Sequence, residues 1–544
     1  MPETKTQNRA NQPITYRGNE VPMRRVLEIS LDSPRSFDNA PQEASLAATF
    51  TAPSGRQVAW QGFWDGGNAW RVRYSPDETG TWHYALTLQS IDGAIITQRS
   101  GSFNATAALN ETVFDRHGPV RLADDKRNLV HADGTPFFWL ADTAWNGPLR
   151  SQDDEWQRYI DTRVRQRFNT VQWVATHWRA STTDIEGQVT FTGSDRIAIN
   201  PAFFQRLDGK LEMLTTHGLL NAPVMLWAVG HGENPEIDPG YGLPESEAIL
   251  LARYQVARWA AYPVVWILGG DGKYFGDFAA RWRRIGRATF GDQPHAPVAM
   301  HCGGEQWPAE EFRDEPWLDI LGYQSGHGDS DKTLNWIVRG EPATDWNKTP
   351  RLFQLNLEPA YENHLGYQSR QPHTPHSVRM AMYWSLLNAP TAGVTYGGHG
   401  VWGWDDGTTA PADHPNSGVP LPWPQAINMP GAEQVAHLAD AFTNLPWQTL
   451  APAPSLLQEQ PGDADVHRFV AVSASSNHDL VVAYTPAGDA ITLSSTVIGN
   501  GYVGEWFDPR TGERVAAEAN EVGNGRVFSP PTQEDWLLIL RTTS

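Results

Sequence analysis

The chain has 544 residues, of which 40% are hydrophobic and 19% are Asp, Glu, Lys or Arg; this predicts several domains and excludes a mostly disordered protein. The formal net charge of −20 is spread along the chain, which disfavours nucleic acid as a partner because nucleic-acid binding needs clustered Lys and Arg. The single cysteine, Cys302, excludes an intramolecular disulfide framework and a metal site built on several cysteines.

The amino-terminal segment shows no sign of export or membrane insertion. Residues 1–13 are expected to be disordered or extended, and they contain no apolar stretch of the kind found in signal peptides. No run in the chain approaches the ~18 apolar residues of a transmembrane helix. We therefore expect a cytoplasmic protein with no membrane partner; a periplasmic or secreted location would apply if a signal peptide was removed. The sequence indicates no oligomeric state.

Residues 14–108 have the pattern of an antiparallel β-sandwich. Short alternating runs such as AWRVRYSP and TWHYALTLQ are separated by turn sequences such as PSG and DGG. Regular strands at this spacing are typical of a sandwich. Trp70 and Tyr74 lie on one face of the same strand and are expected in its core.

Residues 115–447 alternate between apolar runs and amphipathic segments of helical period. The eight apolar runs are 136–142, 168–176, 221–228, 263–271, 296–304, 318–327, 351–359 and 392–404. Apolar strands alternating with helices predict a parallel sheet covered by helices, and eight repeats fit a closed (β/α)₈ barrel. A six-stranded doubly wound sheet is the alternative, but no Gly-rich phosphate loop follows the first run.

Start signals accompany the intervening helices. Ser151 precedes two acidic residues, Asn200 precedes a proline, and Ser377 precedes a stripe of apolar residues at helical spacing. Each is expected at the beginning of a helix on the outside of the barrel.

From about residue 433 the pattern returns to strands. A last helix leads through the Pro-rich segment 451–455 into runs such as DLVVAYTP and WLLILRT, so residues 452–544 are predicted to form a second β-sandwich. Trp64 in the first sandwich and Trp506 in the second are the tryptophans expected to be able to reach the surface. Spacers packed on the barrel are the simpler interpretation of both sandwiches.

Polar and aromatic side chains occur at all eight predicted strand ends. The active site of such a barrel lies at the carboxyl ends of its strands. Tryptophan, of which the chain has 24, also stacks on the apolar faces of sugar rings. The predicted substrate-binding residues are Asp142, Trp145, His177, Trp178, Trp227, His231, His301, Tyr323, Gln324, His327, Glu362, Tyr396, His399 and Trp402.

Two of the acidic residues fit the chemistry of glycosidic bond cleavage. That reaction needs one carboxyl group to protonate the leaving oxygen and one to attack or support the anomeric carbon. Asp271 ends the fourth apolar run and Glu358 ends the seventh, so they face each other across the barrel mouth. A separation of about 5–5.5 Å would indicate retention of configuration, and a wider one inversion. The acid, Asp271, requires a pKa raised by burial or by a neighbouring carboxylate.

Metal-assisted hydrolysis is the alternative chemistry, with His177, His231, His301 and an Asp as ligands. Barrel amidohydrolases place a His-x-His pair at the end of strand one, where this chain has Asp142-Thr-Ala-Trp145. We therefore expect no metal and no other cofactor.

Five motifs in order resemble the apiosidase-like glycoside hydrolase barrel. They are segments 128–145, 266–271, 324–327, 358–362 and 396–402, and the likeness spans roughly residues 115 to 430. The amino-terminal block resembles the sandwich module often found before such barrels. The carboxyl-terminal block is similar to the small sandwich of collagen-binding type that often follows them, although this label indicates no function here.

The resemblance implies an exo-acting, retaining glycosidase on the side chains of plant polysaccharides, with apiose as the characterised sugar, Asp271 as acid/base and Glu358 as nucleophile. The sequence departs from the larger clan of retaining barrel glycosidases because Gly270-Asp271 stands where an Asn-Glu pair is usual. Glu362 is the rival nucleophile. An endo-acting glycanase and a barrel that binds carbohydrate without cleaving it remain alternatives, and carbohydrate is the expected partner in each.

Overall fold

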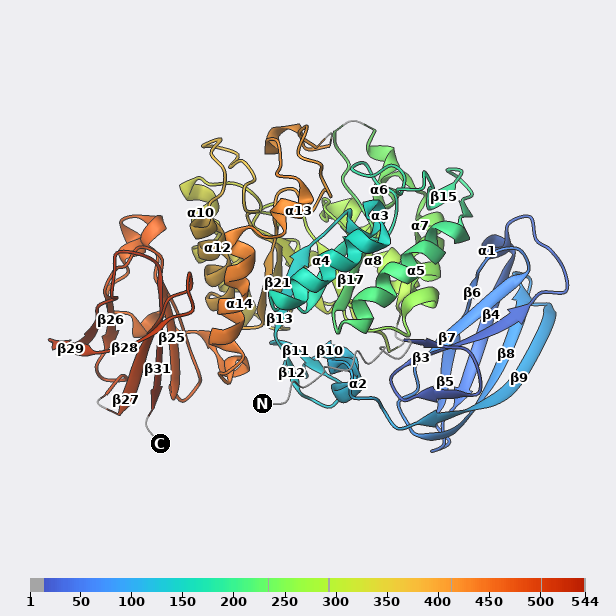
Figure 1. The fold of residues 1–544 in the computed structure, drawn as a ribbon, viewed down its shortest axis with the longest axis horizontal. Helices are drawn as coiled ribbons and strands as arrows, with labels where there is room; N and C mark the ends of the chain where they lie inside the picture. Colours follow the sequence, from blue (N-terminus) through green and yellow to red (C-terminus); the bar gives the residue numbers. More distant parts are fainter. Residues whose placement is uncertain (1–13, 233, 292–293, 412, 500, 543–544) are drawn as a thin grey trace, which may run out of the picture.

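The computed structural model describes residues 14–544 except 233, 292–293, 412, 500 and 543–544. The expectation for residues 1–13 therefore lies outside the described residues. A central barrel is flanked by two modules of antiparallel sheets, one from each end of the chain, as the sequence predicts (Figure 1).

The amino-terminal module is a sandwich of two sheets. The first has the order β1 (Thr15–Tyr16), β3 (Val26–Asp32), β7 (Ala69–Tyr74) and β6 (Phe63–Trp64). The second has the order β2 (Glu20–Pro22), β9 (Ile95–Thr106), β8 (Gly80–Ser90), β4 (Ala44–Thr51) and β5 (Gln57–Gln61). Trp70 and Tyr74 are buried in its core as expected, while the edge strands β1 and β2 pair parallel to their neighbours.

The central barrel has the eight parallel strands that the apolar runs predict. They are β13 (Trp139–Thr143), β14 (Thr170–Val174), β17 (Leu220–Leu226), β18 (Trp266–Gly269), β19 (Val298–His301), β20 (Ile320–Gln324), β21 (Phe353–Glu358) and β22 (Gly393–Tyr396). Hydrogen bonds join them in chain order, and β13 also pairs with β22.

Amphipathic helices cover the outside of the barrel (Figure 1). The longer ones are α4 (Asp153–Arg165), α5 (Pro201–Thr216), α7 (Glu245–Trp259), α8 (Gly276–Thr289), α10 (Asp331–Arg339), α12 (Pro375–Leu387) and α14 (Pro430–Phe442). Asn200 caps α5 as predicted, its side chain accepting a hydrogen bond from the backbone of Ala202. Two predicted starts are wrong: Gln152 rather than Ser151 caps α4, and α12 begins two residues before Ser377.

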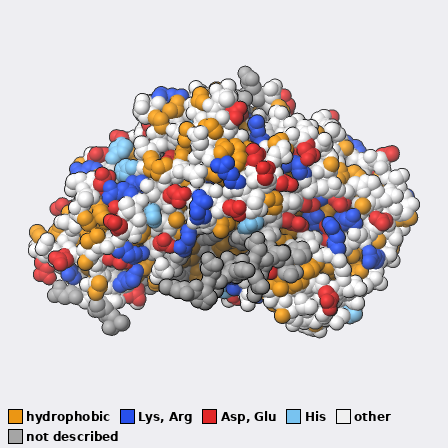
Figure 2. Space-filling view, viewed as in Figure 1, with side chains coloured by type: hydrophobic (Ala, Val, Ile, Leu, Met, Phe, Trp, Pro, Cys, Tyr) orange, Lys and Arg blue, Asp and Glu red, His pale blue; other side chains and the backbone are white. Residues whose placement is uncertain are grey.

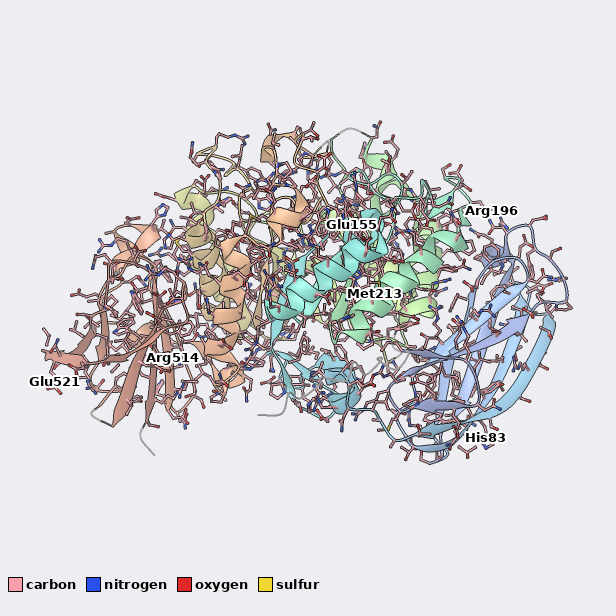
Figure 3. The ribbon with its side chains drawn as sticks, in the orientation of Figure 1. His83, Glu155, Arg196, Met213, Arg514 and Glu521 are labelled. Atoms are coloured by element: carbon pink, nitrogen blue, oxygen red, sulfur yellow. The ribbon has the colours of Figure 1, made fainter. Side chains whose placement is uncertain are left out.

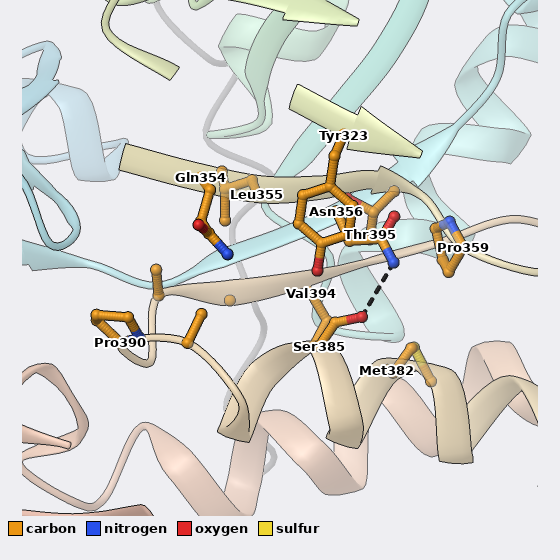
Figure 4. Close-up of a pocket in the computed structure, with 13 residues that line it drawn as sticks. Tyr323, Gln354, Leu355, Asn356, Pro359, Met382, Ser385, Pro390, Val394 and Thr395 are labelled. Carbon is orange, nitrogen blue, oxygen red and sulfur yellow. Dashed lines mark hydrogen bonds between the residues drawn. The ribbon is translucent and has the colours of Figure 1, made fainter. Parts of the chain in front are cut away.

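The barrel is open at one place, where β21 and β22 are not hydrogen-bonded to each other. Polar side chains and a small internal cavity lie in this gap, between the strands and α12 (Figure 4). The amide of Asn356 donates to the hydroxyls of Ser325 (2.9 Å) and Ser385 (3.0 Å). Since this one pair of neighbouring strands lacks hydrogen bonds, the predicted closed barrel is nearly closed.

A small sheet lies at the amino ends of the barrel strands (Figure 1). It consists of β10 (Val120–Leu122), β11 (Leu129–His131) and β12 (Pro136–Phe137) and leads directly into β13. The loops that follow the barrel strands, with the short helices α3 (Gly147–Arg150), α6 (Pro239–Gly242) and α13 (Trp423–Ala426), lie at the opposite end.

The carboxyl-terminal module is the predicted second sandwich. One sheet has the order β23 (Ala451–Pro452), β24 (Ala471–Ala474), β25 (Leu480–Thr485), β31 (Trp536–Thr542), β27 (Tyr502–Phe507) and β28 (Arg514–Ala517). The other has the order β26 (Ile491–Ser494), β30 (Gly525–Phe528) and β29 (Ala519–Val522). Trp506 is 1% exposed and packs against Trp536, so the expectation of a surface position for it is wrong.

Buried ion pairs attach both modules to the barrel helices. Arg73 of the first module pairs with Asp208 of α5 at 2.6 Å, and Arg379 of α12 pairs with Asp535 of the last module at 2.7 Å. The labelled residues His83 and Glu521 lie on the parts of the modules that face away from the barrel (Figure 3). The modules are therefore anchored against the helices on the barrel's sides.

Acidic and basic side chains are interspersed on the face shown in Figure 2, without a large patch of one sign. Among the described residues, no helix combines the length and apolar character that crossing a membrane would require.

Candidate active site

The two predicted catalytic carboxylates lie at the carboxyl ends of their strands. Glu358 is the last residue of β21, and Asp271 follows the last residue of β18 by two positions. Register shifts interrupt the pairing of β18 with β19 and of β20 with β21, just before these ends. Such irregularities often re-aim side chains beside active sites.

Glu358 is held by two histidines. His327 Nε2 is hydrogen-bonded to one carboxylate oxygen at 3.1 Å, and His301 Nε2 lies 3.2 Å from the other. The backbone N–H of Tyr361 donates to Nδ1 of His327, which leaves the proton of that ring on Nε2, facing Glu358. Burial opposes the charge of Glu358, but the interactions with His301 and His327 outweigh it and lower the pKa of Glu358.

Asp271 has the opposite environment. Burial and the nearby charge of Glu358 raise the pKa of Asp271 to about 6, although His301 and Arg179 counteract them. Asp271 therefore retains its proton under mildly acidic conditions in which Glu358 is ionised. Two carboxyl groups whose environments push their pKa values apart can divide the roles of acid and nucleophile.

Three of the predicted tryptophans form an aromatic cluster beside Glu358. The rings of Trp178 and Trp227 are 4.3 Å apart, and Trp145 lies 5.7 Å from Trp227 and 5.5 Å from His301. Trp145 also donates to the hydroxyl of Tyr361. Trp227 Nε1 and His301 Nδ1 are buried and have no hydrogen-bond partner among the described residues.

Histidines form a second cluster on the other side of Glu358. His327 stacks on His364 with ring centroids 4.1 Å apart, and His364 also packs against His399 and His414. Burial lowers the pKa of His399 and of His414 to about 4, so both are neutral at neutral pH. Trp402 donates to His399, which places two more predicted residues beside this cluster.

Three predicted residues form their hydrogen bonds with other parts of the protein; they are Asp142, Glu362 and Tyr396. Asp142 accepts hydrogen bonds from Tyr159 (2.6 Å) and Arg163 (2.8 Å) of α4, on the outside of the barrel. Glu362, the rival nucleophile, accepts from the hydroxyl of Tyr396 (2.7 Å) and from the backbone at the start of α14 (2.9 Å). These contacts indicate that the three residues position neighbouring elements, and a role in binding substrate stays a prediction for them.

The remaining predicted residues are more dispersed. Tyr323 packs against Trp307 and Trp336 and lines the gap between β21 and β22. Gln324 pairs with Glu358 in the register of β20 and β21. His177 lies against Phe191 in the loop after β14, whereas His231 is exposed in the loop after β17.

Several residues near the two carboxylates are missing from the sequence prediction. Arg179 and Asp238 lie in the loops after β14 and β17, and Asp413 lies in the loop after β22. Tyr361 and Tyr367 follow β21, and Glu358 contributes to raising the pKa of both, after burial. Tyr361 stands inside the Glu-Pro-Ala-Tyr-Glu motif and Arg179 directly follows Trp178, so adjacency to predicted residues was the one available signal.

In the part of the chain that the structure describes, no three His, Cys, Asp or Glu side chains are arranged so that they could hold a metal ion. The alternative chemistry would need three histidines as ligands of one metal ion. They have different neighbours: His177 lies against Phe191, His231 is exposed, and His301 lies beside Glu358.

Family comparisons match all three parts of the chain. The description "Apiosidase-like, catalytic domain" matches residues 123–449. The description "Domain of unknown function (DUF5060)" matches residues 20–89, and "Putative collagen-binding domain of a collagenase" matches residues 451–541. No curated protein matches the sequence significantly.

Solved structures share the fold. A protein described as "Glycoside hydrolase" has a TM-score of 0.68 at 21% identity, covering 79% of this chain and 98% of its own. A glycoside hydrolase family 5 protein from Bacteroides vulgatus has a TM-score of 0.68 at 21% identity, covering 78% and 94%. A "putative glycoside hydrolase" from the same species has a TM-score of 0.69 at 17% identity, covering 97% and 100%. With its barrel matched over residues 123–449, this chain belongs to the apiosidase-like family and is a glycoside hydrolase.

Proposed function

We propose that the protein is an exo-acting, retaining glycosidase that removes a terminal sugar from a plant-type oligosaccharide or glycoside. The observation that carries the assignment of roles is the contrast between the two carboxyl groups. The pKa of Asp271 is raised to about 6, mainly by burial, whereas the histidines lower the pKa of Glu358.

In the proposed reaction, ionised Glu358 attacks the anomeric carbon while protonated Asp271 gives its proton to the leaving oxygen. His301 and His327 hold the carboxylate of Glu358 from both oxygens and thereby fix its orientation. Asp271, now ionised, then takes a proton from water, which attacks the glycosyl-enzyme and releases the sugar with its configuration retained.

The loops at the mouth support exo action. Arg179 contacts segments after β17 and β22, so loops from three strands are connected over one side of the strand ends. Connected loops favour a pocket that accepts a chain end. An endo-acting glycanase would instead need a cleft that is open on both sides.

A panel of aryl glycosides and plant oligosaccharides tests the proposal. The wild-type protein is expected to release a monosaccharide, and Asp271→Asn and Glu358→Gln are expected to lose nearly all of this activity. NMR of the first product formed would establish retention. Release of internal fragments before any monosaccharide would contradict exo action, and full activity of Glu358→Gln would contradict the assignment of the nucleophile.

Glu362→Gln is the matched control, because it removes the same type of carboxylate four residues further along. It is expected to retain measurable turnover, since Glu362 interacts with Tyr396 and α14. Complete loss in Glu362→Gln at an unchanged unfolding temperature, with activity kept in Glu358→Gln, would reverse the two roles.

A further inference from the structure

Arg179 joins three loops at the barrel mouth. Its backbone N–H donates to Oδ1 of Asp238, at 3.1 Å, in the loop after β17. Its guanidinium donates to the carbonyl oxygen of His231, at 3.3 Å, in the same loop. Its Nε lies 3.9 Å from Oδ2 of Asp413, in the loop after β22. Two carboxyl groups from separate loops are thus brought to one arginine.

The polar atoms of this group are only partly used within the protein. Asp238 is fully buried, and its Oδ2 has no hydrogen-bond partner among the described residues; the same holds for Nε of Arg179. Buried polar atoms normally have partners, and the exceptions call for a functional explanation. A ligand with hydroxyl groups would provide donors for Asp238 Oδ2.

The loops that carry this group lie against the residues that surround Glu358. Asp413 precedes His414, whose ring lies 6.3 Å from that of His327, the residue hydrogen-bonded to Glu358. Asp238 lies two residues before Gly240, whose backbone N–H donates to the carbonyl oxygen of Trp227. Burial raises the pKa of Asp238 to about 7, and the charges of Asp413 and Asp271 contribute to the rise. Arg179 in turn opposes the rise in the pKa of Asp271. The two carboxyl groups therefore belong to loops that contact the aromatic cluster and the histidine cluster beside Glu358.

We propose that Asp238 and Asp413, joined by Arg179, are specificity-determining residues that bind hydroxyl groups of an uncharged sugar and disfavour a uronic acid. Carboxylates accept hydrogen bonds from hydroxyl groups, and two of them can bind two neighbouring hydroxyls. A uronic acid would bring a further negative charge to the carboxyl groups of Asp238 and Asp413, which already share the single guanidinium of Arg179. This proposal rests on the proposed function, because it names the substrate class of the same site.

The test measures binding separately from turnover. Glucose, galactose and mannose 4-nitrophenyl glycosides and the matching glucuronide, galacturonide and mannuronide are titrated by calorimetry at pH 7.5 into Glu358→Gln protein. At least one neutral compound is expected to bind more tightly than its uronic partner, by about tenfold or more, because like charges brought together are costly. Adding Asp413→Asn or Asp238→Asn is expected to weaken binding of the neutral compound and to reduce the preference.

Asp406→Asn is the matched control, because Asp406 lies seven positions from Asp413 but is exposed and accepts hydrogen bonds from Thr408. It is expected to leave the preference unchanged, and unfolding temperatures identify any variant that fails to fold. Asparagine keeps the shape of Asp238, and Asp413 provides a second variant if Asp238→Asn is unstable.

The proposal is overturned if every uronic compound binds as tightly as its neutral partner, if no neutral compound binds, or if both Asn variants keep the wild-type preference. Neutral compounds that bind with the expected preference but are not hydrolysed by the wild-type protein would contradict the proposed function alone. Hydrolysis with an unchanged preference in the variants would contradict the subsite alone.

Discussion

Replacing Asp271 by asparagine should stabilise the folded protein at neutral pH while it removes activity. The pKa of Asp271 rises from its ordinary value of 3.8 to about 6, chiefly through burial and then through the charge of Glu358. At about 1.4 kcal/mol for each pKa unit, this difference corresponds to at most about 3 kcal/mol. The ionised form of Asp271 is therefore costly in the folded state.

The sign of the pH dependence follows from proton binding. The folded state binds the Asp271 proton more tightly than the unfolded state, so this residue costs nothing below pH 3.8, where both states are protonated. As the pH rises from 3.8 to about 6, the unfolded state ionises first and stability falls. Above about pH 6 the full cost applies, and Asp271→Asn avoids it.

The assay is thermal unfolding of the wild-type protein and Asp271→Asn between pH 4.5 and pH 8. For a barrel of this size, about 3 kcal/mol corresponds to a rise of about 4 °C in the unfolding temperature of the variant at pH 7.5. The difference should shrink towards pH 4.5. Asp406→Asn, which removes an exposed carboxylate, should show no such difference. A variant that is no more stable than the wild type at pH 7.5, or whose advantage does not depend on pH, would refute this account of Asp271.

Three further predictions follow from the same contacts. The activity of the wild-type protein should fall as the pH rises through about 6, where Asp271 loses its proton; a pH profile of kcat/KM with no decline up to pH 8 would exclude Asp271 as the acid. Arg163→Met leaves the buried carboxylate of Asp142 without its ion pair and should destabilise the protein by about 3–5 kcal/mol in thermal unfolding, partly restored by adding Asp142→Asn. EDTA should leave hydrolysis unchanged, and a loss of activity that added metal restores would point to metal-assisted chemistry instead.

The sequence was sufficient for the architecture because periodicity is a local property. Eight apolar runs separated by amphipathic segments predicted eight parallel strands and their covering helices, and the structure has both. The gap between β21 and β22 was not predictable, because the pairing of two strands depends on contacts between segments that are separate in the chain and not on the period of either strand.

For the site, position at a strand end was informative but direction was not. Glu358 and Asp142 both end apolar runs, yet one meets two histidines and the other meets Arg163 and Tyr159 of α4. Whether a strand-end residue faces the barrel mouth or the helix layer depends on local twist and bulges, which no short motif specifies. Arg179 was missed for a different reason, since its partners come from loops without a periodic pattern.

The placement of histidines explains how one fold can give two carboxyl groups different protonation. Burial alone would raise the pKa of both Asp271 and Glu358. His301 and His327 form their close contacts with Glu358, so they stabilise its charge, and that charge in turn helps to keep the proton on Asp271. Replacing His327 by alanine should therefore affect both carboxyl groups: the pKa of Glu358 should rise, because it loses a hydrogen bond, and Asp271 should lose a charge that lowers its own pKa.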